Sequence, residues 1–273
     1  MSVISMQGAG LRRGDRTLWR GLDLEIEPGE FVAVLGPNGA GKSSLLKVLL
    51  GSLPLTEGRA LVAGVPPRRG SPAVGYVPQQ KGFHSDLAAR GVDLVALGVD
   101  GHRFGLRRSH GRAARVEAAI AAVGATSYAA RPVGRLSGGE QQRLRIAQAL
   151  VGDPAVLLCD EPLLSLDLNH QRGVVELLDR RRRQASTAVV MVTHEINPVL
   201  PYVDRVVYVV DGRTAIGAPD DVLTSERLSA LYGTRIDVLR VRDRIVVLGA
   251  ETEPHHDHDH FHDAGEGEWH THE

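Results

Sequence analysis

Short apolar runs recur along the chain and predict the strands of a central sheet. One run, at residues 22–26, alternates apolar with acidic residues, the pattern of a strand with one exposed face. Other runs are continuously apolar, as strands buried on both faces are, at residues 31–35, 155–159, 188–192 and 206–210. Segments typical of helices lie between the runs, at residues 42–50, 139–151 and 174–183. Buried strands that alternate with helices predict an α/β fold with a largely parallel sheet.

Residues of about 86–135 interrupt this alternation. Apolar side chains recur there at helical spacing from Val116 to Val123, and Gly124 is a residue at which helices commonly end. We therefore expect a helical subdomain over about 86–135.

Two hairpins are predicted towards the end of the chain. The first spans residues 207–216 around an Asp-Gly turn, a dipeptide that suits tight hairpins. The second joins apolar segments at 236–241 and 245–248, and it predicts a short β extension over residues 234–250.

The remaining residues, 251–273, form a tail with very few apolar side chains, which predicts disorder. The tail holds seven of the 12 histidines, among them His255, His256, His258, His260 and His262. Imidazole mixed with carboxylate suits transition metals better than Mg²⁺ or Ca²⁺. We expect this His/Asp-rich tail to bind an ion such as Zn²⁺, and a merely solvated tail is the alternative.

Composition and charge narrow the classes of protein. The chain has 273 residues, of which 42% are hydrophobic and 24% charged, as in ordinary globular proteins. Lys and Arg number 32 against 33 acidic residues, a balance that argues against a nucleic-acid-coating protein. The single cysteine, Cys159, excludes an internal disulfide and indicates a reducing compartment. No apolar run approaches the roughly 18 residues that span a bilayer, and the N-terminus lacks a signal-peptide pattern, so we expect a cytoplasmic chain.

A glycine-rich phosphate loop follows the apolar run at 31–35. Its residues match G-x-x-x-x-G-K-[ST] and stand between a predicted strand and a predicted helix: Gly36, Pro37, Asn38, Gly39, Ala40, Gly41, Lys42 and Ser43, with Ser44 next. Such a loop points backbone N–H groups and a helix N-terminus at phosphate oxygens. We expect Lys42 to reach the β- and γ-phosphates of a nucleotide and the Ser43 hydroxyl to bind Mg²⁺.

Two further segments carry chemistry that fits a phosphate loop. Asp160 and Glu161 end the apolar run at 155–159, where Asp160 suits a ligand of Mg²⁺ or its water, and Glu161 suits a base that orients water. Ser137, Gly138 and Gly139 begin a predicted helix and form a second anion site. One chain has little use for two γ-phosphate sites around one nucleotide. We therefore expect two chains to face each other head to tail, so that each nucleotide contacts the phosphate loop of one chain and the second anion site of the other.

These motifs occur in the order and spacing of ABC-transporter nucleotide-binding subunits, which the chain resembles over about residues 3–233. The set consists of the phosphate loop, Gln79 in GYVPQ, LSGGEQQR, LLCDEP, Ser165-Leu166-Asp167 and His194 in VTHE. The resemblance implies an ABC-type ATPase domain over residues 1–233, which binds ATP and Mg²⁺ and works as a homodimer. It also implies integral membrane permease subunits as partners, an extracytoplasmic metal-binding protein of the same system, and a place on the inner face of the cell membrane.

The resemblance also implies roles for individual residues. Gln79 would contact Mg²⁺ and sense the membrane subunits, while Ser137 and Gly139 would close on the ATP of the opposite protomer. His194 would hold the γ-phosphate and the attacking water near Glu161. Asp167 would link the two sites across the dimer. At one position the chain departs from the family, because Arg13 stands where an aromatic ring usually stacks on adenine. A guanidinium group also stacks on bases.

Several short segments resemble particular branches of the family, and they suggest the transported cargo. GYVPQQ, VTHEINPVL, the short extension after residue 233 and the tail resemble the zinc and manganese importer branch, so we expect import of a divalent transition metal. Leu168-Asn169-His170-Gln171 is also similar to iron-siderophore and haem importers, which are the alternative. A non-transport ABC ATPase, such as the iron–sulfur assembly type, is a further alternative.

Overall fold

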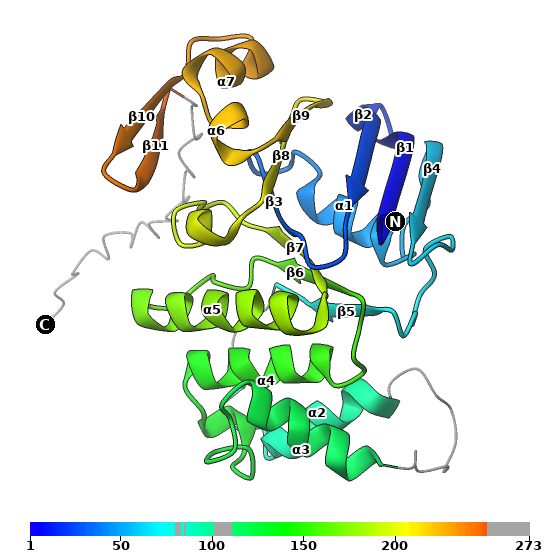
Figure 1. The fold of residues 1–273 in the computed structure, drawn as a ribbon, viewed down its shortest axis with the longest axis vertical. Helices are drawn as coiled ribbons and strands as arrows, with labels where there is room; N and C mark the ends of the chain where they lie inside the picture. Colours follow the sequence, from blue (N-terminus) through cyan, green and yellow to red (C-terminus); the bar gives the residue numbers. More distant parts are fainter. Residues whose placement is uncertain (80–82, 85, 101–110, 250–273) are drawn as a thin grey trace, which may run out of the picture.

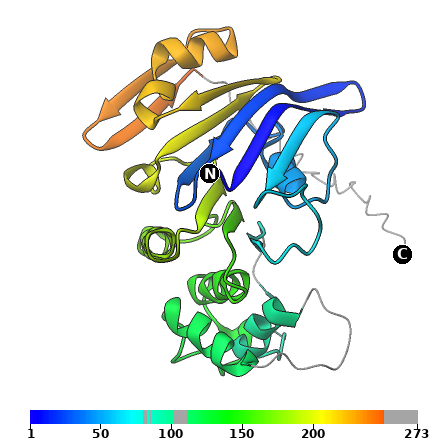
Figure 2. The same cartoon turned by 45° about the vertical axis from the view of Figure 1, so that its right-hand side comes forward.

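The computed structural model describes residues 1–79, 83–84, 86–100 and 111–249 (Figures 1 and 2). The predictions of disorder and of metal binding for residues 251–273 concern a segment outside the described residues. In the part of the chain that the structure describes, no helix combines the length and apolar character needed to cross a bilayer.

The centre of the molecule is a six-stranded sheet with the order β5-β6-β7-β3-β8-β9. Its strands are β3 (Phe31–Leu35), β5 (Val74–Val77), β6 (Val156–Asp160), β7 (Ala188–Val192), β8 (Arg205–Val210) and β9 (Arg213–Gly217). Neighbours from β5 to β8 pair in parallel, whereas β8 and β9 form an antiparallel hairpin. The α/β prediction and the hairpin around Asp211-Gly212 are confirmed.

A second sheet, of three antiparallel strands, has the order β2-β1-β4. It is built from β1 (Ile4–Arg13), β2 (Arg16–Ile26) and β4 (Glu57–Val62), and α1 (Lys42–Leu49) contacts β4 and β6. The alternating run at 22–26 lies in β2 as predicted. Gly8 and Gly10 obscure the strand pattern of β1, and Gly8, with φ +54°, lies where the pairing of β1 with both neighbouring strands is irregular. In β4, Gly58 has no room for a side chain, because a Cβ there would lie 2.3 Å from the carbonyl oxygen of Gly8.

The helices on the other side of the central sheet are α2 (Gly91–Asp100), α3 (Arg112–Ala122), α4 (Gly138–Leu150) and α5 (Leu168–Ala185). In Figure 1, α2, α3 and α4 lie together at the bottom, and α5 lies between them and the sheet. Short 3₁₀ turns occupy Val133–Arg135 and Leu200–Tyr202. Helix α5 starts earlier than the expected residue 174 because Asp167 caps it and accepts the N–H of His170.

The apolar core has two layers, one on each face of the central sheet. Phe31, Ala33 and Leu35 of β3 pack into the layer formed with helices α2 to α5, and Val32 and Val34 pack into the layer that includes α1 and the second sheet. Alternate residues of each buried strand therefore serve both layers, which is why the strands read as continuously apolar.

The described chain ends in α6 (Pro219–Val222), α7 (Ser225–Tyr232) and the antiparallel hairpin of β10 (Asp237–Val241) and β11 (Arg244–Leu248). The predicted strand segments at 236–241 and 245–248 are confirmed. Figure 1 shows the hairpin next to α7 and apart from the second sheet.

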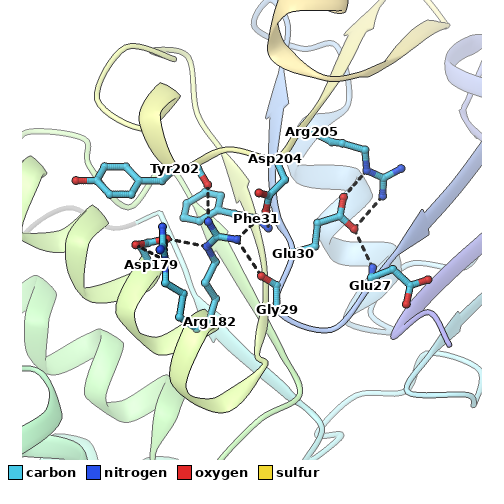
Figure 3. A network of polar contacts seen from close by, with 10 residues as sticks. Glu27, Gly29, Glu30, Phe31, Asp179, Arg182, Tyr202, Asp204 and Arg205 are labelled. Atoms are coloured by element: carbon cyan, nitrogen blue, oxygen red, sulfur yellow. Dashed lines mark hydrogen bonds and ion pairs between the residues drawn. The ribbon is translucent and has the colours of Figure 1, made fainter.

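One arginine ties together three segments at the edge of the sheet where β3 begins (Figure 3). Arg182 of α5 donates to the Asp179 and Asp204 carboxylates, at 2.8 Å each, and to the carbonyl oxygens of Gly29 at 3.1 Å and Tyr202 at 3.2 Å. Asp204 in turn accepts the N–H of Phe31 at 2.8 Å. These bonds hold α5, the start of β3 and the segment before β8 in one arrangement.

We expect Arg182→Ala to lower the free energy of unfolding by about 2–4 kcal/mol, because it removes charge-assisted hydrogen bonds from a side chain that is only 12% exposed. Urea unfolding of the full chain measures this. Arg183→Ala is the matched control, since Arg183 binds the same Asp179 but is 66% exposed, and its loss should stay below about 1 kcal/mol. Equal losses in the two variants would contradict the prediction.

Candidate functional site

The phosphate loop runs from the end of β3 to the start of α1, and two of its glycines are required by close packing. Gly36 has φ +140°, and a Cβ there would lie 2.0 Å from the carbonyl oxygen of Val209. Gly41 has φ +98°, and a Cβ there would lie 3.1 Å from Trp19. Larger residues would displace the loop from the sheet, so these glycines keep its curled shape.

Lys42 is held inside this loop. Its Nζ donates to the carbonyl oxygens of Gly36 at 2.7 Å and Pro37 at 2.9 Å, and the residue is 6% exposed. Burial lowers the pKa of Lys42, and the nearby carboxylates of Glu161 and Asp160 partly oppose that shift. A buried ammonium group at a helix N-terminus offers a strong site for a phosphate.

Ser43 and Asp160 meet across the same edge of the sheet. The Ser43 hydroxyl donates to Oδ1 of Asp160 at 2.9 Å, and Asp160 is 5% exposed. A hydroxyl and a carboxylate are the oxygen ligands that Mg²⁺ prefers, and it commonly adds water and phosphate oxygens to them. The donor set present therefore fits Mg²⁺.

Glu161 brings together three of the residues predicted from sequence. Its Oε2 accepts a hydrogen bond from Nε2 of Gln79 at 2.8 Å and lies 3.7 Å from Nδ1 of His194. The backbone of Glu161 has φ +46°, a conformation that is unfavourable for a side chain of this size, and its N–H donates to Val192 at 2.9 Å. A cavity of about 130 Å³ lies here, lined by Glu161, Ser165, Thr193 and His194 among others.

Ser137 begins α4 with a reciprocal cap. Its hydroxyl accepts the N–H of Glu140, and the Glu140 carboxylate accepts the N–H of Ser137. Within the described residues, these hydrogen bonds and the packing of Gly139 against His170 do not connect the segment to the phosphate loop. The structure thus groups Lys42, Ser43, Asp160, Glu161, Gln79 and His194, and it places Ser137, Gly138 and Gly139 in a separate segment.

Asp167 is linked to that second segment through His170, a connection not predicted from sequence. The pKa of Asp167 is lowered because its carboxylate accepts the backbone N–H of His170 and contacts the ring Nδ1 at 2.6 Å. A Cβ on Gly139 would lie 2.1 Å from the same ring. The three-residue spacing of Asp167 and His170 in a first helical turn is the sequence signal that predicts their contact.

Arg16 is a second residue that sequence reasoning missed. A Cβ on Gly39 would lie 3.4 Å from Nη1 of Arg16, so this guanidinium lies against the phosphate loop. Arg13 is exposed beside the turn between β1 and β2, and Trp19 is fully buried. Arg13 and Arg16 are paired across this turn, which brings two cations to its end.

The contact of Gly139 with His170 predicts opposite effects at neighbouring glycines. Gly139→Ala should lower the free energy of unfolding by about 1–3 kcal/mol, because the new methyl group displaces the ring. Gly138→Ala should be neutral or stabilising by up to about 1 kcal/mol, since its nearest neighbour would be Leu166 at 3.9 Å and alanine favours helices. Urea unfolding of both variants tests this.

A double mutant separates the steric cause from a general helix effect. In a His170→Ala background, Gly139→Ala should cost much less stability than in the unmodified chain. An unchanged cost would show that the ring is not what Gly139 accommodates.

Comparisons with known proteins show which family the chain belongs to. The ABC transporter family model matches residues 19–164. The hemin import ATP-binding protein HmuV of Myxococcus xanthus is 37% identical over 245 residues, covering 81% of this chain and 89% of that protein. The zinc transport system ATP-binding protein TroB of Treponema pallidum is 37% identical over 220 residues, covering 80% and 82%. By contrast, the chain spans 52% of the length of YvrA, an uncharacterized ABC transporter ATP-binding protein of Bacillus subtilis.

A solved structure also shares the fold. It is described as an inward-facing conformation of a metal-chelate type ABC transporter, and it superposes with a TM-score of 0.76 at 28% identity over 90% of this chain and 96% of that one. The family match covers more than half of the chain and includes the phosphate loop and the Asp160–Glu161 pair. The chain belongs to the ABC transporter family, as an ATP-hydrolysing subunit with the α/β P-loop fold of that family.

Proposed function

We propose that the chain drives import of a divalent transition metal, zinc or manganese, by binding and hydrolysing ATP for membrane permease subunits. The histidine-rich tail, together with the zinc-type segment VTHEINPVL, carries the choice of cargo. The likeness to the zinc transport protein TroB over 80% of this chain supports it. In this proposal the tail binds Zn²⁺ outside the ATPase fold.

A second candidate cargo is an iron chelate or haem. The equal identity to HmuV favours it, as does the Leu168-Asn169-His170-Gln171 segment. His170 of that segment contacts Asp167 and Gly139, residues of the ATPase itself. Because this contact serves the ATPase, the segment is a weaker guide to cargo than the histidine-rich tail.

We infer that two copies of the chain bind ATP between them. The phosphate loop holds the phosphates from one side, and Ser137 with Gly139 of the opposite copy supplies backbone N–H groups at a helix N-terminus from the other. The separation of these segments within one chain supports this arrangement. Asp167 contacts His170, whose ring packs against Gly139, and these contacts support a role for Asp167 in linking the two sites.

The proposed mechanism assigns a step to each residue of the cluster. Lys42 leaves the loop carbonyls to bind the β- and γ-phosphates, and Ser43, Asp160 and Gln79 would hold Mg²⁺, which neutralises phosphate charge when bound. Glu161 accepts a proton from the water whose oxygen attacks the γ-phosphorus. The bond from that phosphorus to the bridging oxygen breaks, giving ADP and phosphate. His194 orients the water and the γ-phosphate.

Glu161→Gln tests the assignment of the base. We expect kcat to fall by about 10² or more, because an amide keeps the shape of the side chain but accepts no proton. ATP affinity should be retained, and size-exclusion chromatography with ATP should show a stable dimer. Glu195→Gln is the control, since Glu195 also lines the cavity but its recorded hydrogen bonds to Thr193 use the backbone. Undiminished hydrolysis in Glu161→Gln would remove Glu161 from its role.

Metal content of cells tests the cargo. A strain that lacks this chain should accumulate less zinc or manganese than its parent, and the full chain should restore uptake while Glu161→Gln should not. Iron measured in the same cells reports on the second candidate, and a deficit confined to iron would overturn the zinc and manganese assignment. A chain truncated after Ala250 should retain ATPase activity and lose Zn²⁺ binding by calorimetry. Equal Zn²⁺ binding by both chains would remove the tail from the proposal.

A further inference from the structure

The loop that carries His194 is tied to the C-terminal hairpin by one side chain. Nδ2 of Asn197 donates to the carbonyl oxygen of Ile245 at 2.9 Å, and the N–H of Ile245 donates to Oδ1 of Asn197 at 2.8 Å. The amide group thus completes both backbone hydrogen bonds of a residue that lies 48 positions away in sequence. Both bonds are partly buried, which limits competition from water.

The hairpin has its own attachments and does not depend on this loop for its place. Ser229 Oγ accepts the N–H of Ile236 at 2.9 Å, and Ser225 Oγ accepts the N–H of Val238 at 2.8 Å. Arg240 pairs with Asp220 of α6 at 2.7 Å. The hairpin is therefore fixed to α6 and α7, and it offers Ile245 to the loop as a fixed point.

Between His194 and Asn197 the chain consists of short-range turns. The Thr193 hydroxyl donates to the carbonyl oxygen of Glu195 and accepts its N–H, and the carbonyl oxygen of Ile196 accepts the N–H groups of Val199 and Leu200. Ile196 is buried in the same apolar layer as Ile245. Because these turns restrict the backbone between the two residues, a displacement of Asn197 also displaces His194. The His194 side chain is 46% exposed and lies 3.7 Å from Glu161.

We propose that Asn197 is a positioning residue for His194, through which the β10–β11 hairpin sets the place of the histidine loop during ATP hydrolysis. The inference rests on the role proposed above for His194 and is independent of the cargo. It gives the C-terminal extension a part in the ATPase cycle. The chain continues from β11 directly into the histidine-rich tail, so the tail is joined to the strand that holds Asn197.

The test compares kcat with KM for ATP in the full chain. Asn197→Ala should lower kcat about fivefold to tenfold and leave KM within about twofold, because Lys42 and Ser43 bind ATP from a different loop. Asn197→Asp keeps the acceptor for the Ile245 N–H but loses the donor, so its kcat should be intermediate. Arg240→Ala is the control, because it removes only an exposed ion pair with Asp220 and leaves the Ser225 and Ser229 attachments and both Asn197 bonds in place, so it should keep the unmodified kcat.

A His194→Ala background identifies the route of the effect. There the residual hydrolysis, measured at high enzyme concentration, should show no further loss when Asn197→Ala is added. A further loss of hydrolysis in the double variant, equal losses in Asn197→Ala and Arg240→Ala, or an unchanged kcat in Asn197→Ala would overturn this inference. None of these three results would affect the role proposed for His194. Full activity in His194→Ala would overturn the proposed role of His194 and this inference with it.

Discussion

The site depends on one constraint, the meeting of parallel strand ends at a single edge of the central sheet. Val192 of β7 is in register with Val34 of β3 on one side and with Asp160 of β6 on the other. The next residues along these strands begin the phosphate loop, the Glu161 turn and the His194 loop. Hydrogen bonds between strand backbones therefore bring the ammonium group of Lys42, the carboxylates of Asp160 and Glu161 and the imidazole of His194 to the same edge of the sheet.

Close packing then gives each loop its shape. Gly36 lies so near the backbone of β8 that no side chain fits there, and Glu161 adopts a left-handed conformation that its bonds to Val192 and Gln79 hold in place. At the opposite end of β3, the Arg182 hydrogen bonds join α5 to the sheet. Gly36 and Glu161 therefore lie at the edge where the strands end, and the Arg182 hydrogen bonds lie at the edge where β3 begins.

Much of this arrangement could be predicted because its signals are local. A strand buried on both faces has to be apolar at every position, so the core strands β3, β6, β7 and β8 are visible in the sequence, and Lys42, Ser43 and Glu161 follow from their place after such strands. The strand β1 could not be predicted in this way. Gly8 and Gly10 make it resemble a loop, and the irregular pairing of β1 with β2 and β4 around these glycines is visible only in the structure.

The sequence by itself determined the class of fold and the ATPase family, and it predicted the residues for nucleotide chemistry, because such signals depend on residue types at short spacing. The tertiary structure alone decided which distant residues meet: Arg16 beside Gly39, His170 against Gly139, and Asn197 on Ile245. The two residues of each pair lie 23 to 48 positions apart in the sequence, and no pattern of neighbouring residues encodes such a contact. Packing between elements is their physical cause.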